Sequence, residues 1–224
     1  AGSPAGSIVG GACAAGMSGD EIVRMASKRG WTNMTRPSLS PLGLLSSAPM
    51  GNFIDHEFPV TTFEDLPIPF AAVACDFESG EEVVLKDTGD LSFAIRASCA
   101  MPGVFAPLIE KNNRMLVDGG VVSPMPTDAV QQMGADVVIA VDLMACGATF
   151  GTRPRTAFGM MFQSAMMLLR AASRNQRYHA DVVIIPQIAH LRPDQINKRD
   201  EFISLGEVAA NEKIDEIKTL LDDS

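Results

Sequence analysis

Apolar runs along the chain predict its strands. They occupy residues 70–76, 114–117, 136–142 and 180–185, and runs of this length are typical of strands buried inside a sheet. Residues 82–86 predict one more strand, which the turn at residues 78–81 joins to the first run as a hairpin.

Segments of helix-forming composition precede and separate these strands, at residues 6–15, 18–29, 91–100, 127–133, 158–178 and 201–221. Ser18 and Glu21 have the spacing of a capping box at the start of the second helix. Small residues at Gly6, Gly10 and Ala14 predict that the first helix lies very close to a sheet.

The order of these elements predicts the fold class. Strands that alternate with helices from residue 70 onward indicate an α/β fold, in three α/β/α layers with a mostly parallel central sheet. The length of 224 residues fits one domain, residues 1–224. Residues 31–55 interrupt the pattern and predict a loop with a short helical turn, a candidate flap.

Composition excludes some classes of function. A net charge of −9 argues against a nucleic-acid partner, which would need a basic face. No run reaches the roughly 18–20 apolar residues of a membrane helix, and no signal-peptide pattern is present. Four spaced cysteines, Cys13, Cys75, Cys99 and Cys146, predict buried reduced thiols, which suits a cytoplasmic protein.

The strongest candidate for chemistry is the stretch around Asp118. A short apolar strand ends there on a carboxylate followed by Gly119 and Gly120. Open α/β folds place their chemistry at the carboxyl ends of strands. An aspartate that only caps the turn is the simpler interpretation, and this stretch alone leaves both open.

Other candidate residues form no complete site. His56, His179 and His190 lie outside glycine-rich turns, and the sequence predicts no metal site and no cofactor. Asp142 also ends a strand, so paired carboxylates are an alternative. Arg96 and Ser98 are candidates for lining a cleft, or for ordinary packing.

A nucleophile elbow is approximated only at the start of the chain. Residues 2–6 read Gly-Ser-Pro-Ala-Gly, whereas the GxSxG elbow has serine at the centre. Here the central residue is Pro4, immediately before the helix that is expected to pack closely.

Together these segments resemble the patatin-like phospholipases, in particular the bacterial branch related to neuropathy target esterase. Residues 2–10 look like the family's elbow and following helix, and residues 96–98 with 101–107 match the segment before the catalytic acid. Residues 117–121 match its Asp-Gly-Gly motif, and residues 135–142 are similar to the next strand. The combination is specific and covers nearly the whole chain.

The resemblance implies a Ser-Asp dyad enzyme that hydrolyses lipid or short-chain carboxylic esters. Asp118 takes the place of the catalytic base. The residues expected near the substrate and the oxyanion are Gly2, Ala5, Gly6, Gly119 and Gly120. The implied partners are a lipid or ester substrate and a peripheral membrane contact, in a cytoplasmic or membrane-associated protein.

Two departures from the family define the alternatives. The family's first strand and its GGGxRG oxyanion loop precede the elbow, so the chain is expected to be truncated at its N-terminus and to form a homo-oligomer over the exposed sheet edge. In addition, Pro4 has no hydroxyl and its ring holds φ near −65°, which disfavours the strained elbow. Ser3 and Ser7 are therefore the candidate replacement nucleophiles; the alternative is an inactive member that binds lipid or a partner.

Overall fold

The computed structural model describes residues 1–28, 34–145, 154–192 and 195–222, which form two compact units, residues 1–129 and 130–224. Each unit is described by itself. The helices of the first unit are α1 (Ala5–Ala14), α2 (Gly19–Lys28), α3 (Ala48–Glu57), α4 (Leu91–Ser98) and the 3-10 turn η2 (Gly119–Val121). Its strands are β1 (Arg36–Pro37), β2 (Gly43–Ser46), β3 (Ala71–Asp76), β4 (Glu82–Lys86), β5 (Gly103–Phe105), β6 (Leu108–Ile109) and β7 (Met115–Asp118).

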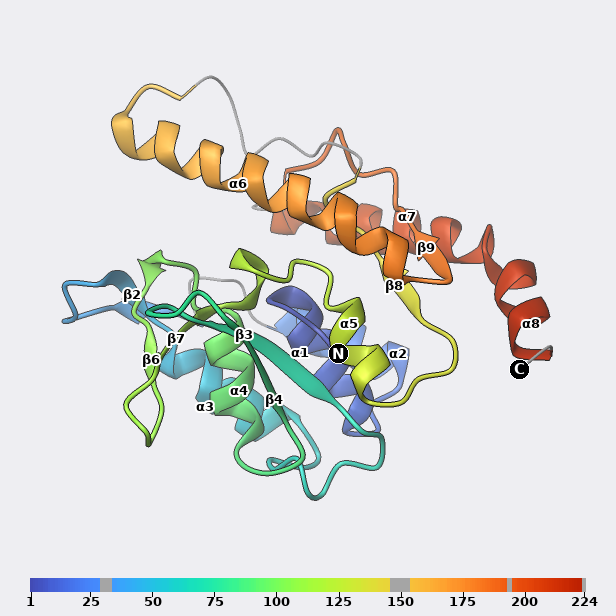
Figure 1. Ribbon diagram of the computed structural model, residues 1–224, viewed down its shortest axis with the longest axis horizontal. Coiled ribbons are helices and arrows are strands. Elements are labelled where there is room, and N and C mark those ends of the chain that lie inside the picture. The colour runs from blue at the N-terminus through green and yellow to red at the C-terminus, as the bar shows by residue number, and fades with distance from the viewer. Residues whose placement is uncertain (29–33, 146–153, 193–194, 223–224) are drawn as a thin grey trace. The chain divides into compact units, whose positions relative to one another are not determined.

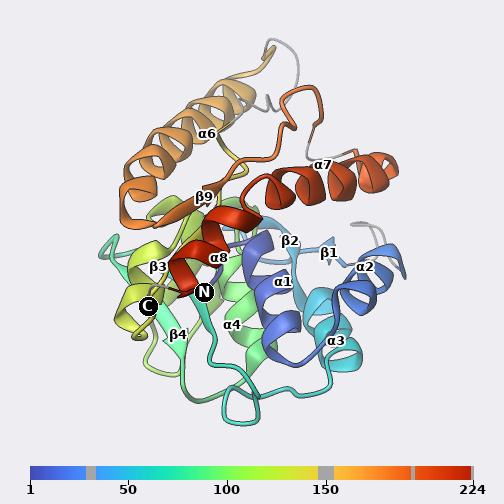
Figure 2. The same cartoon turned by 90° about the vertical axis from the view of Figure 1, so that its right-hand side faces the viewer.

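The first unit is built on β3, as the apolar run at residues 70–76 predicts. A four-stranded sheet has the order β4-β3-β7-β6, and a smaller one has the order β1-β2-β5. Helices α1 and α4 lie against β3 (Figures 1 and 2). The larger hydrophobic cluster joins α1, α3 and α4 around residues such as Met50, Phe70 and Ile95. The smaller one lies around Ala97, Phe105 and Leu116.

The α/β class is confirmed, but strand directions differ from the expectation of a mostly parallel sheet. β3 pairs antiparallel with both β4 and β7, and β6 pairs antiparallel with β7. Short turns join β3 to β4 and β6 to β7, and a short turn can only connect antiparallel strands. Parallel pairing occurs between β2 and β5, between β8 and β9, and at the bridge from Gly2 to Ala72.

Local signals at the helix ends are confirmed. Ser18 and Glu21 form the capping box, with Ser18 N–H donating to Glu21 Oε2 at 2.8 Å and Glu21 N–H donating to Ser18 Oγ at 3.3 Å. Gly16 follows α1 with φ of +90°, a conformation that favours glycine. Residues 34–57 differ from the expected loop, because they form the hairpin of β1 and β2 and the ten-residue helix α3.

The second unit contains α5 from its middle onward and the elements that follow. These are α5 (Thr127–Gln132), β8 (Ile139–Val141), α6 (Ala157–Gln176), η3 (Arg177–His179), β9 (Val182–Ile184), η4 (Ile196–Lys198), α7 (Arg199–Asn211) and α8 (Ile214–Asp222). The single closing helix expected at residues 201–221 is two helices. β8 is also less buried than expected, with Ile139 and Val141 exposed on either side of buried Ala140.

Among the cysteines, Cys75 and Cys99 are buried as predicted, whereas Cys13 is exposed on α1, so the expectation was wrong there. Cys146 lies outside the described residues. No helix in the described part of the chain is long and apolar enough to cross a membrane.

Candidate active site

One edge of β3 brings the start of the chain and the Asp-Gly-Gly turn together. β4 occupies the other edge over residues 71–75. On the edge away from β4, Asp118 lies opposite Ala74 and Gly2 lies opposite Ala72. Gly2 forms backbone hydrogen bonds of 3.0 Å with both neighbours of Ala72. Because Ala72 and Ala74 are two residues apart, Gly2 and Asp118 lie about 7 Å apart along the strand direction.

The turn after Asp118 requires its glycines. A Cβ on Gly119 would lie 2.0 Å from the backbone oxygen of Val73, so no side chain fits there. A Cβ on Gly120 would lie 3.0 Å from Asp118 Oδ1 and 3.6 Å from Pro4 Cδ. The turn therefore passes directly over β3 and places the Asp118 carboxylate beside the elbow segment.

Asp118 caps its turn, and its pKa is raised by burial. Its Oδ1 accepts a hydrogen bond from Gly120 N at 2.6 Å, as a turn cap does. Its side chain is only 4% exposed. Burial raises the pKa of Asp118 to about 7, although the Gly120 N–H acts in the opposite direction. A carboxyl group with this pKa can accept and return a proton near neutral pH.

The elbow segment starts α1 without a strained residue. Pro4 has φ of −34° and ψ of −75°, in the right-handed helical region, and its ring excludes the positive φ of a strained elbow. In the described residues the only non-glycine positions with positive φ are Asp87 and Asn113. A Cβ on Gly2 would lie 2.2 Å from the Gly6 carbonyl group, so glycine at position 2 lets the chain turn sharply into the helix.

Both candidate serines lie at this site, and both donate to backbone carbonyl groups. Ser3 is 8% exposed, and its Oγ donates to Ser123 O at 2.8 Å, in the loop that follows η2. Ser7 is fully buried, and its Oγ donates to Pro4 O at 2.6 Å. The hydrogen bonds of the described residues include none from these hydroxyls to Asp118.

Cys99 belongs to the same environment, although the sequence predicted only a buried thiol there. Its Sγ donates to Pro4 O at 3.3 Å and lies 3.8 Å from Ser7 Oγ. Burial, with the nearby Asp118 carboxylate, raises the pKa of the Cys99 thiol to about 12. The thiol is therefore neutral at physiological pH and acts as a hydrogen-bond donor to the elbow.

The glycine N–H groups expected near the oxyanion are largely engaged. Gly2 N–H donates to Ala71 O, and Gly6 N–H donates to Ser3 O at 3.1 Å. Gly120 N–H is held by Asp118. Ala5 is the first residue of α1, next to Pro4.

The other sequence candidates have structural surroundings. Arg96 Nε donates to Ser47 Oγ at 3.2 Å, and its stem fills the space that Gly51 leaves on α3. Ser98 is fully buried, and its Oγ has no hydrogen-bond partner among the described residues. Asp142 is buried in the second unit, where it pairs with Arg177.

The three histidines belong to different segments of the chain, His56 to the first unit and His179 and His190 to the second. His56 is exposed in the last turn of α3. His190 contacts Glu201 at 2.9 Å, and the backbone oxygen of His179 accepts from Gln131. Across the part of the chain that the structure describes, no three His, Cys, Asp or Glu side chains gather as a metal site.

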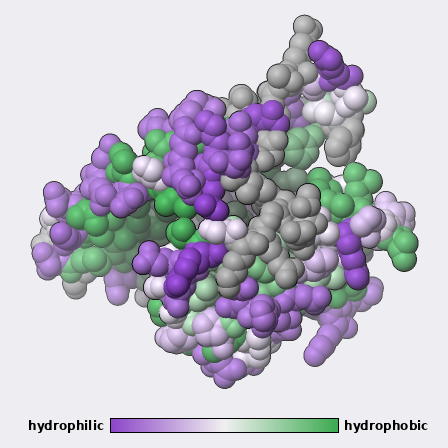
Figure 3. All heavy atoms as spheres, turned by 180° about the vertical axis from the view of Figure 1, so that it is seen from behind, coloured by the Kyte–Doolittle hydropathy of each residue, from purple (hydrophilic) through white to green (hydrophobic). Residues whose placement is uncertain are grey.

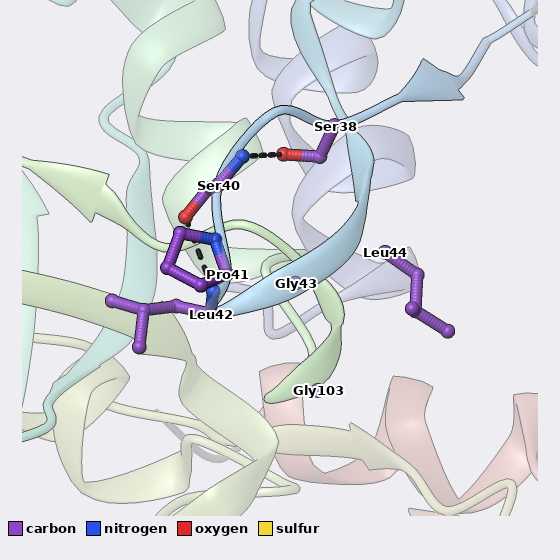
Figure 4. Close-up of a pocket in the computed structure, with 7 residues that line it drawn as sticks. All are labelled: Ser38, Ser40, Pro41, Leu42, Gly43, Leu44 and Gly103. Atoms are coloured by element: carbon purple, nitrogen blue, oxygen red, sulfur yellow. Dashed lines mark hydrogen bonds between the residues drawn. The ribbon is translucent and has the colours of Figure 1, made fainter.

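A surface pocket of about 270 Å³ lies under the tip of the β1–β2 hairpin. Figure 4 shows its uncharged lining, which comes from the turn between β1 and β2, from the start of β2 and from the start of β5. The lining residues are Ser38, Ser40, Pro41, Leu42, Gly43, Leu44 and Gly103. This segment falls within the candidate flap.

Comparison with known proteins identifies the first unit. A model of the family described as patatin-like phospholipase matches residues 1–130, which coincide with the first unit. The chain belongs to this family.

Curated relatives agree with this assignment. An NTE family protein of Mycobacterium tuberculosis is 39% identical over 146 residues, which cover 64% of this chain and 40% of the relative. Patatin-like phospholipase domain-containing protein 7 of Mus musculus is 34% identical over 101 residues, covering 45% of this chain and 7% of the relative. Protein 6 of the same series from Homo sapiens is 36% identical over 91 residues, covering 40% and 6%. The matched segments thus cover 40% or less of the length of these relatives.

Proposed function

We propose that this chain is a serine acyl hydrolase that cleaves carboxylic esters of lipids, with Asp118 as the general base. The observation that carries the proposal is the position of Asp118, a buried carboxylate beside Pro4 on the edge of β3 that also holds Gly2. Membership of a phospholipase family supports a lipid ester as the substrate.

Ser3 is the preferred nucleophile of the two candidates. It retains some exposure, whereas Ser7 is fully buried inside the first turn of α1. Its hydroxyl bonds to Ser123, in the loop that continues the Asp118 turn. In the proposed reaction the Ser3 hydroxyl exchanges this carbonyl acceptor for the Asp118 carboxylate.

The reaction then follows two balanced steps. Ser3 Oγ attacks the ester carbonyl carbon while its proton passes to Asp118, and collapse of the tetrahedral oxyanion expels the alcohol, which takes the proton from Asp118. Water then attacks the acyl-enzyme while Asp118 accepts a proton from it, and the serine leaves reprotonated with release of the carboxylic acid.

Hydrolysis of p-nitrophenyl butyrate by the purified chain tests this proposal. We expect Asp118→Asn and Ser3→Ala each to lower kcat/KM at least about 100-fold. We also expect the rate of the unaltered chain to rise with pH to a plateau with a midpoint near 7, because only the carboxylate accepts a proton.

Asp76→Asn is the matched control, because Asp76 also ends a strand and also caps a turn, through Glu78 N. It should leave the rate unchanged. Equal rates for Asp118→Asn and the unaltered chain would remove Asp118 from the reaction.

A second candidate function is a binding protein that holds a lipid ester without cleaving it. Its support is Pro4, which lacks a hydroxyl at the elbow position and imposes an unstrained backbone. A fluorophosphonate probe separates the two functions. Covalent labelling at Ser3 or Ser7 excludes the binding protein, whereas absence of labelling with retained ester binding excludes the hydrolase.

A further inference from the structure

The hairpin of β1 and β2 has an apolar tip, which is a different segment from the Asp118 turn. We propose that this tip, residues 38–44, docks the protein on a lipid surface by inserting Leu39, Leu42 and Leu44 into the bilayer interface. This proposal rests on the proposed function, because it takes a lipid ester as the substrate. It adds the surface through which the protein reaches that substrate.

The three leucines are the first observation. Leu39 is fully exposed, at 104% of its reference area, and Leu44 and Leu42 are 70% and 53% exposed. In Figure 1 the hairpin reaches beyond the four-stranded sheet at the left. Figure 3 is seen from behind, so this side lies at the right, where hydrophobic surface is visible. Water contact at several leucines within one turn is unfavourable, so removing them from water supplies a driving force.

The hairpin also lacks the charges that a bilayer interface would penalise. Residues 37–54 contain no Asp, Glu, Lys or Arg, although 20% of the chain is charged. Arg36, at the base of the hairpin, is exposed. Because the whole chain has a net charge of −9, an uncharged tip fits a zwitterionic lipid surface better than an anionic one.

Three backbone N–H groups of the tip are bonded within the tip itself, which lowers the cost of placing it against lipid. Ser38 N–H donates to Leu44 O at 2.9 Å, Ser40 N–H to Ser38 Oγ at 3.0 Å, and Leu42 N–H to Ser40 Oγ at 3.2 Å. Figure 4 shows the two serine bonds, with Leu42 and Leu44 projecting away from the turn. Pro41 has no N–H. Polar backbone groups enter an apolar phase at low cost only when they are bonded internally.

A second copy of the chain is a weaker occupant of this surface. β1 is the edge strand of its sheet, but it has only the two residues Arg36 and Pro37. An edge this short, with a proline that lacks an N–H, offers almost no ladder for strand addition.

The hairpin is connected to the Asp118 site through β5. Gly43 pairs with Gly103, and Ala100 O accepts a hydrogen bond from Asp118 N at 3.0 Å. Gly103 follows Ala100 by three residues, which span at most about 11 Å. A bilayer that contacts the tip therefore lies close to the proposed reaction site.

Co-sedimentation with phosphatidylcholine vesicles tests the docking. We expect the unaltered chain to bind, with little dependence on salt, and Leu39→Ser/Leu42→Ser/Leu44→Ser to bind at least about tenfold more weakly. The matched control is Ile68→Ser/Phe77→Ser, which removes similarly exposed apolar side chains elsewhere in the first unit, 51% and 56% exposed. This control should bind like the unaltered chain.

A reporter at the tip measures insertion directly. Leu39→Trp in a Trp31→Phe background carries a single tryptophan, because Trp31 is the only one in the chain. We expect its emission to shift to the blue on addition of vesicles and to be quenched by brominated lipid. An unshifted emission, or binding only to anionic vesicles that high salt abolishes, overturns the docking.

Turnover of soluble p-nitrophenyl butyrate separates this proposal from the proposed function. If docking is correct, the triple leucine variant keeps the turnover of the unaltered chain while losing vesicle binding. Vesicle binding that depends on the leucines, without ester hydrolysis, refutes only the proposed hydrolase. Ester hydrolysis with vesicle binding that ignores the leucines refutes only the docking.

Discussion

Burial at Asp118 gives the carboxylate its chemistry and also costs stability. Desolvation raises its pKa from 3.8 to about 7 in the folded chain, so the folded state binds more protons than the unfolded state between these pH values. The free energy of unfolding therefore falls as pH rises from about 4 to 7 and then levels off. Three pKa units correspond to a penalty of roughly 4 kcal/mol at neutral pH and above.

Asp118→Asn should remove this penalty. An asparagine cannot ionise, and its amide oxygen can still accept from Gly120 N. We expect the variant to be about 1–3 kcal/mol more stable than the unaltered chain at pH 8 and not more stable at pH 4. Urea unfolding of both proteins at the two pH values measures the difference in their free energies of unfolding. The contributions of the other carboxylates are the same in both proteins and cancel. A gain that is the same at both pH values contradicts a raised pKa.

Pro4 is the residue whose replacement is most informative about the elbow. Its Cδ lies near Gly120, which follows Asp118 by two residues, so a side-chain hydroxyl at position 4 would lie next to the carboxylate. We expect Pro4→Ser to raise the rate on p-nitrophenyl butyrate at least about tenfold and to create a fluorophosphonate labelling site at residue 4.

Pro4→Ala controls for release of the backbone from the proline ring without adding a hydroxyl. Should both variants show the same rate, the gain belongs to the backbone and position 4 is not a nucleophile site.

At the scale of elements, α1 shows why glycine positions need the structure. The sequence predicted a smooth face at Gly6, Gly10 and Ala14. In the structure a Cβ on Gly11 would lie 2.9 Å from Ile95 Cδ1 and 3.3 Å from Phe58, whereas a Cβ on Gly6 would meet nothing within 4 Å. A Cβ on Gly10 would lie 3.1 Å from Phe70 Cε2, so the close contact includes Gly10 of the predicted face and extends to Gly11, but it does not include Gly6.

Alanine at these two glycines should have opposite effects. Gly6→Ala is expected to raise the free energy of unfolding by about 0.5–1 kcal/mol, because glycine is a poor helix former. Gly11→Ala is expected to lower it by about 1 kcal/mol, because the aromatic and aliphatic neighbours must move apart. Thermal unfolding compares the stabilities of the two variants. Higher stability of both would show that the neighbours of Gly11 can move to accommodate a methyl group.

Local sequence signals predicted the elements that are determined by residues close together in the chain. The apolar run of β3, the Asp-Gly-Gly turn after β7 and the capping box of α2 are all present. Strand direction depends on which segments pair across the chain, so β3 was misassigned to a mostly parallel sheet. Helix α3 was missed because Gly51 and Pro49 weaken its pattern, while its stability comes from contacts with α4.

The candidate site divides in the same way. Asp118, Gly119 and Gly120 were recognisable because the acid and its turn are contiguous in the sequence. The hydrogen bonds of Ser3 to Ser123 and of Cys99 to Pro4 join residues 120 and 95 positions apart, and no local pattern records them.

For the whole molecule, the sequence predicted one domain over residues 1–224 and a homo-oligomer over an exposed sheet edge; both stay predictions. β4 occupies one edge of β3, and β7 with Gly2 occupies the other. The outer strands of this sheet, β4 and β6, are therefore the edges that a second copy would have to cover.

The first unit has the features of an independently folding domain. Both of its hydrophobic clusters use buried residues between Ala12 and Leu116, and the family match ends at residue 130. The boundary between the units at residues 129 and 130 falls inside α5, where Ala129 is fully buried. α5 ends before Gly134, whose φ of +88° stops the helix.

We therefore expect residues 1–134 to unfold in one cooperative urea transition, and residues 1–129 to be about 1–2 kcal/mol less stable. The shorter fragment loses the end of α5, including the hydrogen bonds from Met133 N to Val130 O and from Gly134 N to Gln131 O. The lost turn also leaves the segment around Ala129 free to fray. If residues 1–134 show no cooperative transition while residues 1–224 do, the core of the first unit depends on the rest of the chain, as the prediction of a single domain requires.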